Sequence, residues 1–239
     1  MPLVIECPSP NFDARPQDQP EGQAVDILLL HYTGMESATA ALARMCDESA
    51  KVSAHYCIDE DGVLTRLVHE DKRAWHAGAA SWAGASDINA RAIGIELVNP
   101  GHEFGYRAFP EAQMAALIEL ARDILARHPI PAHRVLGHSD VAPLRKQDPG
   151  ELFDWARLAE NGIGLWPGDA PAVERPEEAE VKRALAAFGY GYLDQDFAAV
   201  LGAFQRHFRP AAVTGEVDGE TAGRLEALPS LVDAGPRET

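Results

Sequence analysis

Two histidines stand at the ends of short apolar segments. His31 follows the run ILLL, and His138 follows RVLG. Apolar runs of this kind are typical of buried strands, so each imidazole is expected at the mouth of a strand. If the two strands are neighbours, the rings converge on one point, and neutral imidazole is the commonest metal ligand among side chains. A hydrogen-bonded structural histidine at each strand end is the alternative.

A third ligand would complete a zinc site, because catalytic zinc takes three protein ligands and keeps one position open for water. The segment GHSDVAPLRKQDPG, residues 137–150, offers Asp140 and Asp148. Asp148 precedes Pro149, and proline biases the residue before it toward an extended backbone, which helps to hold the carboxylate. Asp140 stands in a stretch typical of a turn or helix cap. We therefore expect Asp148 and the two histidines to bind one zinc ion per chain.

Two further residues could take part in catalysis at such a site. Glu96 lies inside the apolar segment AIGIEL, where a carboxyl group is expected to have a raised pKa, toward the range of a general base. The alternative is a core glutamate paired with an arginine. Lys146 could place an ammonium group where an oxyanion develops. From the residues alone, a solvated loop lysine explains Lys146 at least as well.

The elements that must position these residues alternate between strands and helices. In chain order the sequence predicts a strand at 25–33, a helix after Ser37, a hairpin at 52–68 that turns at Asp61-Gly62, a strand at 91–99, an amphipathic helix at 110–128 and a strand at 134–138. Residues 1–25 are rich in proline, aspartate and glutamine and are expected to be irregular. Because a hairpin is antiparallel, the sheet is not purely parallel, and the fold class is α/β or α+β.

A change of composition divides the chain. Residues 166–178, WPGDAPAVERPEE, have the proline and acidic content of a linker. Three helix-like pieces follow, which form a unit of about 60 residues, near the lower limit for independent folding. We expect a catalytic domain at residues 1–168 and a small helical domain at 177–230.

Composition excludes several classes of function. The chain has 37 acidic and 21 basic residues, a net charge of −16 and no basic run, so nucleic acid is a poor partner. No stretch approaches the roughly 20 apolar residues of a membrane span. The N-terminus lacks a basic region and an apolar core of signal type, which predicts a cytoplasmic protein, with the periplasm or cell envelope as the alternative. Three scattered cysteines agree with a reducing compartment. The oligomeric state is left open.

Five ordered blocks carry a family resemblance: LLLHYTG, VSAHYCIDEDG, RAWHAG, AIGIELVNPG and GHSDVAPLRKQDPG. They resemble the N-acetylmuramoyl-L-alanine amidases of the second amidase family, most of all the AmiD-like and then the AmpD-like members, over roughly residues 8–167. The pieces GAFQRHF and TGEVDGETAGRLEAL resemble a peptidoglycan-binding helical domain. The resemblance implies an α/β fold, a mixed central sheet flanked by helices, followed by a small all-α domain.

The resemblance also implies roles for particular residues. The family's zinc ligands fall on His31, His138 and Asp148, its catalytic glutamate on Glu96 and its active-site lysine on Lys146. His76 and Asn89 match positions that border the substrate groove, with buried structural polar residues as the alternative. His55 is expected to be a hydrogen-bonded scaffold residue.

The implied activity is hydrolysis of the amide bond between N-acetylmuramic acid, in its intact or 1,6-anhydro form, and L-alanine of peptidoglycan or muropeptides. The rival function is a peptidoglycan-recognition protein that binds without cutting, and the complete ligand set favours the enzyme. A general zinc peptidase is disfavoured because no HExxH motif is present. The helical tail is expected either to tether the enzyme to cell wall or to pack against the catalytic domain and stabilise it.

Overall fold

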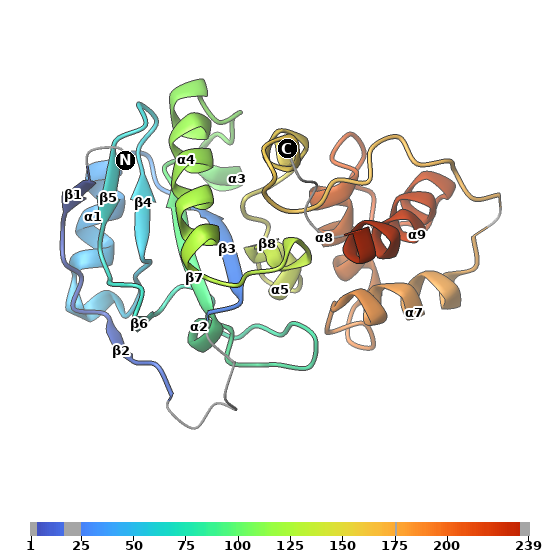
Figure 1. Cartoon of the computed structure of the whole chain (residues 1–239), viewed down its shortest axis with the longest axis horizontal. Helices are drawn as coiled ribbons and strands as arrows, with labels where there is room; N and C mark the ends of the chain where they lie inside the picture. The colour runs from blue at the N-terminus through green and yellow to red at the C-terminus, as the bar shows by residue number, and fades with distance from the viewer. Residues whose placement is uncertain (1–3, 17–24, 175, 235–239) are drawn as a thin grey trace.

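The computed structural model describes residues 4–16, 25–174 and 176–234 of the chain. Its larger part is built on a six-stranded sheet with the order β1-β5-β4-β7-β3-β8 (Figure 1). The strands are β1 (Val4–Glu6), β5 (Leu64–Arg66), β4 (Tyr56–Ile58), β7 (Ala92–Leu97), β3 (Ile27–Tyr32) and β8 (Val135–Gly137). The hairpin strands β4 and β5 are antiparallel, and the other neighbours are parallel. The predicted mixed sheet is confirmed.

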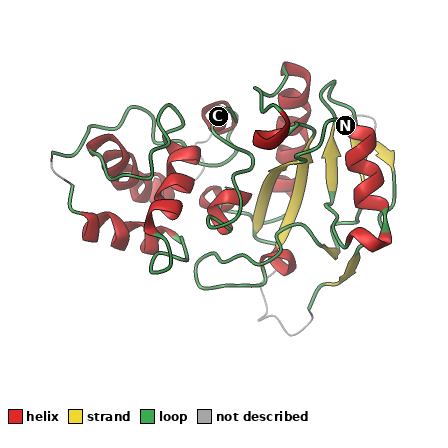
Figure 2. Ribbon diagram, turned by 180° about the vertical axis from the view of Figure 1, so that it is seen from behind, coloured by secondary structure: helices red, strands yellow, loops and turns green. Residues whose placement is uncertain are grey.

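Helices flank this sheet (Figures 1 and 2). They are α1 (Ala38–Cys46), α2 (Ile88–Arg91), α3 (Gly101–Phe104), α4 (Glu111–Arg127), α5 (His138–Val141) and α6 (Trp155–Glu160), with 3-10 turns η1 (Glu48–Ala50) and η2 (Ala132–Arg134). The Ser37 side chain accepts a hydrogen bond from the backbone N–H of Ala40, which fixes the start of α1 where the sequence predicts it. The long amphipathic helix after Pro110 is α4.

The central strand β3 sends alternate side chains into two different cores. Leu28 and Leu30 belong to the apolar cluster that includes the buried face of α4. Ile27 and Leu29 belong to a second cluster on the opposite face. Successive side chains of a strand point to opposite faces, and a strand covered on both faces is apolar throughout. Burial on both faces explains why β3 begins as a continuous apolar run. Its polar side chains come last, where the strand reaches the edge of the sheet.

The expectation of an irregular stretch at residues 1–25 is wrong for two segments. β1 adds to the sheet beside β5, and β2 (Phe12–Ala14) pairs antiparallel with β6 (Lys72–Ala74) in a separate two-stranded sheet. β1 and β2 each have only three residues, of which one is acidic, and most of these side chains are exposed. Segments this short and polar lack the apolar periodicity that predicts a strand. Residues 1–3 and 17–24 lie outside the described part.

The C-terminal unit consists of α7 (Glu178–Phe188), α8 (Phe197–Phe208) and α9 (Gly219–Ala234), as the three helix-like pieces predict. Asp196 begins α8, since its side chain accepts a hydrogen bond from the N–H of Ala199. The three helices lie on the side of α5 that is remote from β1 (Figures 1 and 2). Within the described ranges, no helix combines the length and the apolar character that crossing a membrane requires.

The segment that joins the two parts follows α9 closely. The backbone N–H of Val173 donates to the carbonyl of Gly219, at 2.9 Å. One turn further along α9, Gly223 has no room for a side chain, because the backbone carbonyl of Pro171 occupies that space. The Arg224 guanidinium stacks over the ring of Trp166, 5.3 Å from its centroid. This part of the predicted linker is therefore fixed against the helices that follow it.

Candidate active site

Two neighbouring parallel strands bring His31 and His138 together. β3 ends one residue after His31, and α5 begins at His138, directly after β8. Because β3 and β8 are hydrogen-bonded in parallel, both histidines lie at the same edge of the sheet. Their Nδ1 atoms are 2.9 Å apart, and Asp148 Oδ2 lies 3.1 Å from the first and 3.0 Å from the second. All three side chains are buried.

The spacing and chemistry of this group suit a zinc ion. Ligand atoms at zinc distances of about 2.0–2.2 Å in a tetrahedral site stand roughly 3.3 Å apart, close to the separations seen here. Burial, together with the nearby His138, lowers the pKa of His31 to about 4, so its ring is neutral. Burial opposes the charge of Asp148, but the two histidines hold the pKa of Asp148 well below its usual value. Two imidazoles and a carboxylate are a common zinc donor set.

The far nitrogens of both rings also have partners. His138 Nε2 is 3.0 Å from the carbonyl of Ala77, and since a carbonyl can only accept a hydrogen bond, Nε2–H is the donor. This contact assigns the proton to Nε2 and leaves Nδ1 free as an electron-pair donor. His31 Nε2 is 3.0 Å from His76 Nδ1. Both candidate ligands therefore turn the same nitrogen, Nδ1, toward Asp148.

His76 and Asn89 form hydrogen bonds that support this arrangement. The Asn89 side-chain oxygen accepts hydrogen bonds from the backbone N–H groups of His76 and Ala77, at 3.1 and 2.8 Å. The His76 ring lies against β7 at Gly94, where a Cβ atom would stand 2.5 Å from its Nδ1. Both polar residues are buried. His55 is held to Gly94, as expected for a scaffold histidine, since its Nδ1 accepts the Gly94 N–H at 2.9 Å.

Glu96 stands beside His31 across the sheet, because the two residues are register partners in β7 and β3. Its Oε2 is buried and has no hydrogen-bond partner among the described residues, and no arginine pairs with it there. Burial, reinforced by the charge of Asp148, raises the pKa of Glu96 well above its ordinary value, while Lys146 acts in the opposite direction. An unpaired carboxyl group at the ligand cluster is placed to accept a proton.

Lys146 lies between His138 and Asp148, the two candidate ligands within residues 137–150. Its backbone N–H donates to the carbonyl of Ala142, at 3.1 Å, and the residue is half-buried. Its charge lowers the pKa of both Glu96 and His31, so the ammonium group is close enough to act on the site. No ion-pair partner of Lys146 is seen among the described residues.

Asp140, the rival ligand, turns away from the cluster. It is fully buried, and its carboxylate accepts hydrogen bonds from the Gly137 N–H, the Tyr190 hydroxyl and His207 Nδ1. The turn or cap role expected for Asp140 accounts for the first of these contacts. The other two contacts could not be predicted from the sequence, because Tyr190 and His207 lie far away along the chain. The Ala77 carbonyl could not be predicted either, because a backbone acceptor gives no signal in the amino-acid sequence.

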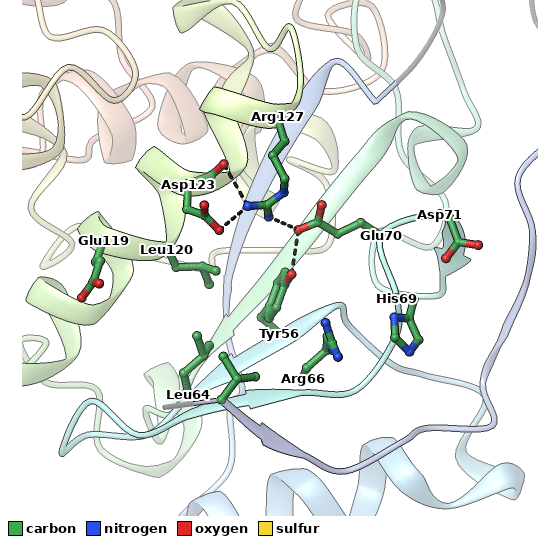
Figure 3. Close-up of a pocket in the computed structure, with 11 residues that line it drawn as sticks. Tyr56, Leu64, Arg66, His69, Glu70, Asp71, Glu119, Leu120, Asp123 and Arg127 are labelled. Atoms are coloured by element: carbon green, nitrogen blue, oxygen red, sulfur yellow. Dashed lines mark hydrogen bonds and ion pairs between the residues drawn. The ribbon is translucent and has the colours of Figure 1, made fainter. Parts of the chain in front are cut away.

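A second ionisable cluster lies elsewhere, beside a cavity of about 410 Å³ between α4 and the hairpin (Figure 3). Glu70 accepts hydrogen bonds from the Tyr56 hydroxyl and from Arg127, and His128 Nε2 lies 2.7 Å from its other oxygen. Burial opposes ionisation, but these partners lower the pKa of Glu70 to about 2. Since the charges are already paired with one another, the cluster has a structural role.

Comparisons with known proteins agree with this geometry. Residues 21–151 match the family profile described as N-acetylmuramoyl-L-alanine amidase, and residues 174–225 match that of a peptidoglycan binding domain. The chain is 37% identical to the amidase AmiD of Escherichia coli over 94% of its own length and 90% of the relative. It is 34% identical to the 1,6-anhydro-N-acetylmuramyl-L-alanine amidase AmpD of Haemophilus influenzae over 65% and 91% of the two chains.

A solved structure extends the likeness to both parts of the chain. The complex of Escherichia coli AmiD with the substrate anhydro-N-acetylmuramic acid-L-Ala-D-gamma-Glu-L-Lys superimposes with a TM-score of 0.79 at 36% identity. The superposition covers 91% of this chain and 93% of that one.

Proposed function

Because the chain belongs to the N-acetylmuramoyl-L-alanine amidase family, we propose that it hydrolyses the amide bond between N-acetylmuramic acid and L-alanine in peptidoglycan fragments. The 1,6-anhydro form is included, since it is the substrate in the complex of the similar AmiD. The activity would serve cell-wall turnover or recycling. The observation that carries the proposal is the buried group of His31, His138 and Asp148, with the unpaired carboxyl group of Glu96 beside it.

We assign one zinc ion per chain to His31, His138 and Asp148. When bound there, zinc supplies a Lewis acid that polarises the scissile carbonyl and lowers the pKa of a water molecule. Glu96 takes the proton of the attacking water and delivers it to the leaving amine, a role that its raised pKa favours. The Lys146 ammonium group stabilises the negative charge that develops on the carbonyl oxygen, and loss of one such group typically costs about 10²–10³ in rate.

His76 and Asn89 support the same site. The substrate-groove position implied by the family resemblance remains a proposal for both residues. Their burial and their contacts favour the alternative, in which Asn89 holds the backbone that carries His76 and His76 orients the ring of His31. We also propose that residues 1–168 form the catalytic domain and residues 177–230 the helical one. The family match at 174–225 supports the second boundary.

The purified protein is expected to contain one zinc ion per chain and to release the stem peptide, beginning with L-alanine, from an anhydro-muropeptide. Mass spectrometry identifies the products, and removal of the metal by a chelator should abolish release until zinc is restored. Intact sacculi assayed in parallel determine whether polymeric substrate is also cut. Zinc-loaded protein that binds muropeptides without cleaving them would instead support the recognition protein.

We place the enzyme in the cytoplasm, with the periplasm or cell envelope as the alternative. The chain has three cysteines, Cys7, Cys46 and Cys57, an odd and scattered set that is untypical of the disulfide frameworks of oxidising compartments. The Sγ atoms of Cys7 and Cys46 are 3.2 Å apart, so an oxidising compartment would be expected to join them. Antibody detection after cell fractionation is expected in the soluble cytoplasmic fraction, with the three thiols reduced by mass. Recovery from the outer membrane would contradict this placement.

A further inference from the structure

The C-terminal helices share one hydrophobic core with the sheet. On the sheet side this core contains Ile27 and Leu29 of β3 and Leu136 of β8. The C-terminal unit contributes buried apolar and aromatic side chains, most of them from its three helices, to the same cluster. They are Val181, Leu185, Tyr190, Val200, Leu201, Ala203, Phe204, Phe208, Ala222, Leu225 and Leu228. β3 and β8 are the strands that carry His31 and His138 at their ends. The helical unit therefore belongs to the same core as the strands that carry the candidate ligands, and its helix α8 contacts α5, which begins at His138.

A polar contact crosses this apolar core at Asp140. The Tyr190 hydroxyl donates to Asp140 Oδ1 at 2.6 Å, and His207 Nδ1 lies 2.7 Å from Oδ2. Both donors come from the C-terminal unit, and Asp140 comes from α5. His207 is itself fixed, because its ring stacks on Trp155 with centroids 3.7 Å apart. Its Nε2 is buried and has no hydrogen-bond partner among the described residues, whereas Nδ1 donates to the Asp140 carboxylate.

Asp140 is in turn connected to the ligand His138. Its Oδ2 also accepts the backbone N–H of Gly137, at 2.7 Å, which closes the turn that starts α5. His138 is the first residue of α5 and lies within this turn. Loss of a donor to this buried carboxylate costs free energy, and a shift of the surrounding chain is the way to recover part of that cost. Any such shift moves the backbone that aims the His138 ring.

We propose that Tyr190 and His207 are positioning residues of the metal site, which act through Asp140 on His138. The affinity for zinc then depends on the hydrogen bonds that the C-terminal unit makes to Asp140, and by linkage bound zinc strengthens those hydrogen bonds. The inference rests on the proposed function only in taking His138 as a ligand. It gives the helical tail a part in building the site, and it favours the packing role over the tether among the two roles expected from the sequence.

Three variants of the full chain test this coupling. Tyr190→Phe removes one hydroxyl and keeps the ring, and His207→Leu removes one of the two donors to Oδ2 and leaves the Gly137 N–H. His207→Asn offers an amide N–H near the place of Nδ1 and should restore much of the affinity. Removal of a group that supports a metal ligand typically weakens metal affinity by about 10–100-fold, and we expect an effect of this size for the first two variants. Competition with a chelating indicator measures the zinc Kd.

Two control variants separate positioning from general stability. Tyr192→Phe makes the same chemical change two residues away, where the hydroxyl has no hydrogen bond among the described residues, and should leave the zinc Kd unchanged. Leu185→Ala opens the shared core without touching Asp140, so it should lower the melting temperature while the folded protein keeps its zinc Kd. An unchanged Kd for Tyr190→Phe would overturn the proposal, as would an equal loss of affinity in Leu185→Ala. Failure of the unaltered protein to bind zinc would instead contradict the proposed function.

Discussion

Replacement of Asp148 by alanine is expected to leave the protein without stoichiometric zinc. The change removes one of the three proposed ligands from a buried site and leaves two imidazoles whose Nδ1 atoms are 2.9 Å apart. Loss of a direct ligand should cost more than the roughly 10–100-fold in affinity that is typical of outer contacts. Elemental analysis after dialysis against a metal-free buffer gives the zinc content per chain, and hydrolysis of an anhydro-muropeptide should fall with it.

The matched control for this variant is Asp154→Ala. Asp154 is an exposed aspartate of the same region that caps α6, so its loss should affect the helix start and leave the metal in place. Asp140→Ala is informative as well. We expect it to weaken zinc binding through His138 but to keep a full site when zinc is saturating. If Asp140→Ala empties the site at saturation and Asp148→Ala does not, the assignment of the third ligand is wrong.

The Glu96→Gln variant is expected to keep its zinc and its fold and to lose most of its turnover. The amide has nearly the shape of the carboxylate but cannot accept the proton of the attacking water. General acid–base catalysis typically contributes about 10²–10⁴ in rate, so kcat should fall by a factor in that range. Steady-state kinetics on an anhydro-muropeptide, with zinc content measured on the same sample, tests this.

The melting temperature of Glu96→Gln distinguishes a catalytic role of Glu96 from a structural one. The pKa of Glu96 is raised in the folded protein, so folding favours its protonated form. Above the pKa of the unfolded chain, the carboxyl group therefore costs stability, and the neutral amide removes that cost. The melting temperature of the metal-free variant at neutral pH should be equal to or higher than that of the unaltered protein. Glu151→Gln, at a half-buried carboxylate paired with His102, is the control for the substitution itself. Near-normal turnover of Glu96→Gln would remove Glu96 from the mechanism.

The residues of the candidate site can be singled out from the sequence because they lie where local patterns are strong. His31 ends a fully apolar strand, and Glu96 interrupts another, so both positions and the raised pKa of Glu96 follow from their neighbours. That β3 and β8 are adjacent could only be assumed, since strand order depends on how the chain packs. β1 and β2 were not predicted, because three-residue strands with acidic side chains carry too little pattern.

The contacts of Asp140 with the C-terminal unit could not be predicted from local sequence patterns, because its partners there are distant along the chain. Tyr190 and His207 are 50 and 67 residues away along the chain. The helical periodicity of their segment predicts that a helix forms there and gives no information about which face of the catalytic part it meets. The composition of residues 166–178 predicts a linker without regular structure, yet Val173 is hydrogen-bonded to α9. Proline and acidic residues indicate an absence of helix or strand, and an extended segment can still be fixed by what it packs against.

The fixed attachment of the joining segment along α9 has a geometric consequence. A flexible tether lets the active site sample many positions around a bound polymer. Here the segment is held at Val173, and the helices beyond it share a core with β3 and β8, so the two parts keep one mutual orientation. A glycan strand held by the helical unit would therefore lie at a constant offset from His31 and His138. Since the disaccharide units of the glycan repeat at regular intervals, this offset would select which stem peptide along the strand reaches the proposed zinc ligands.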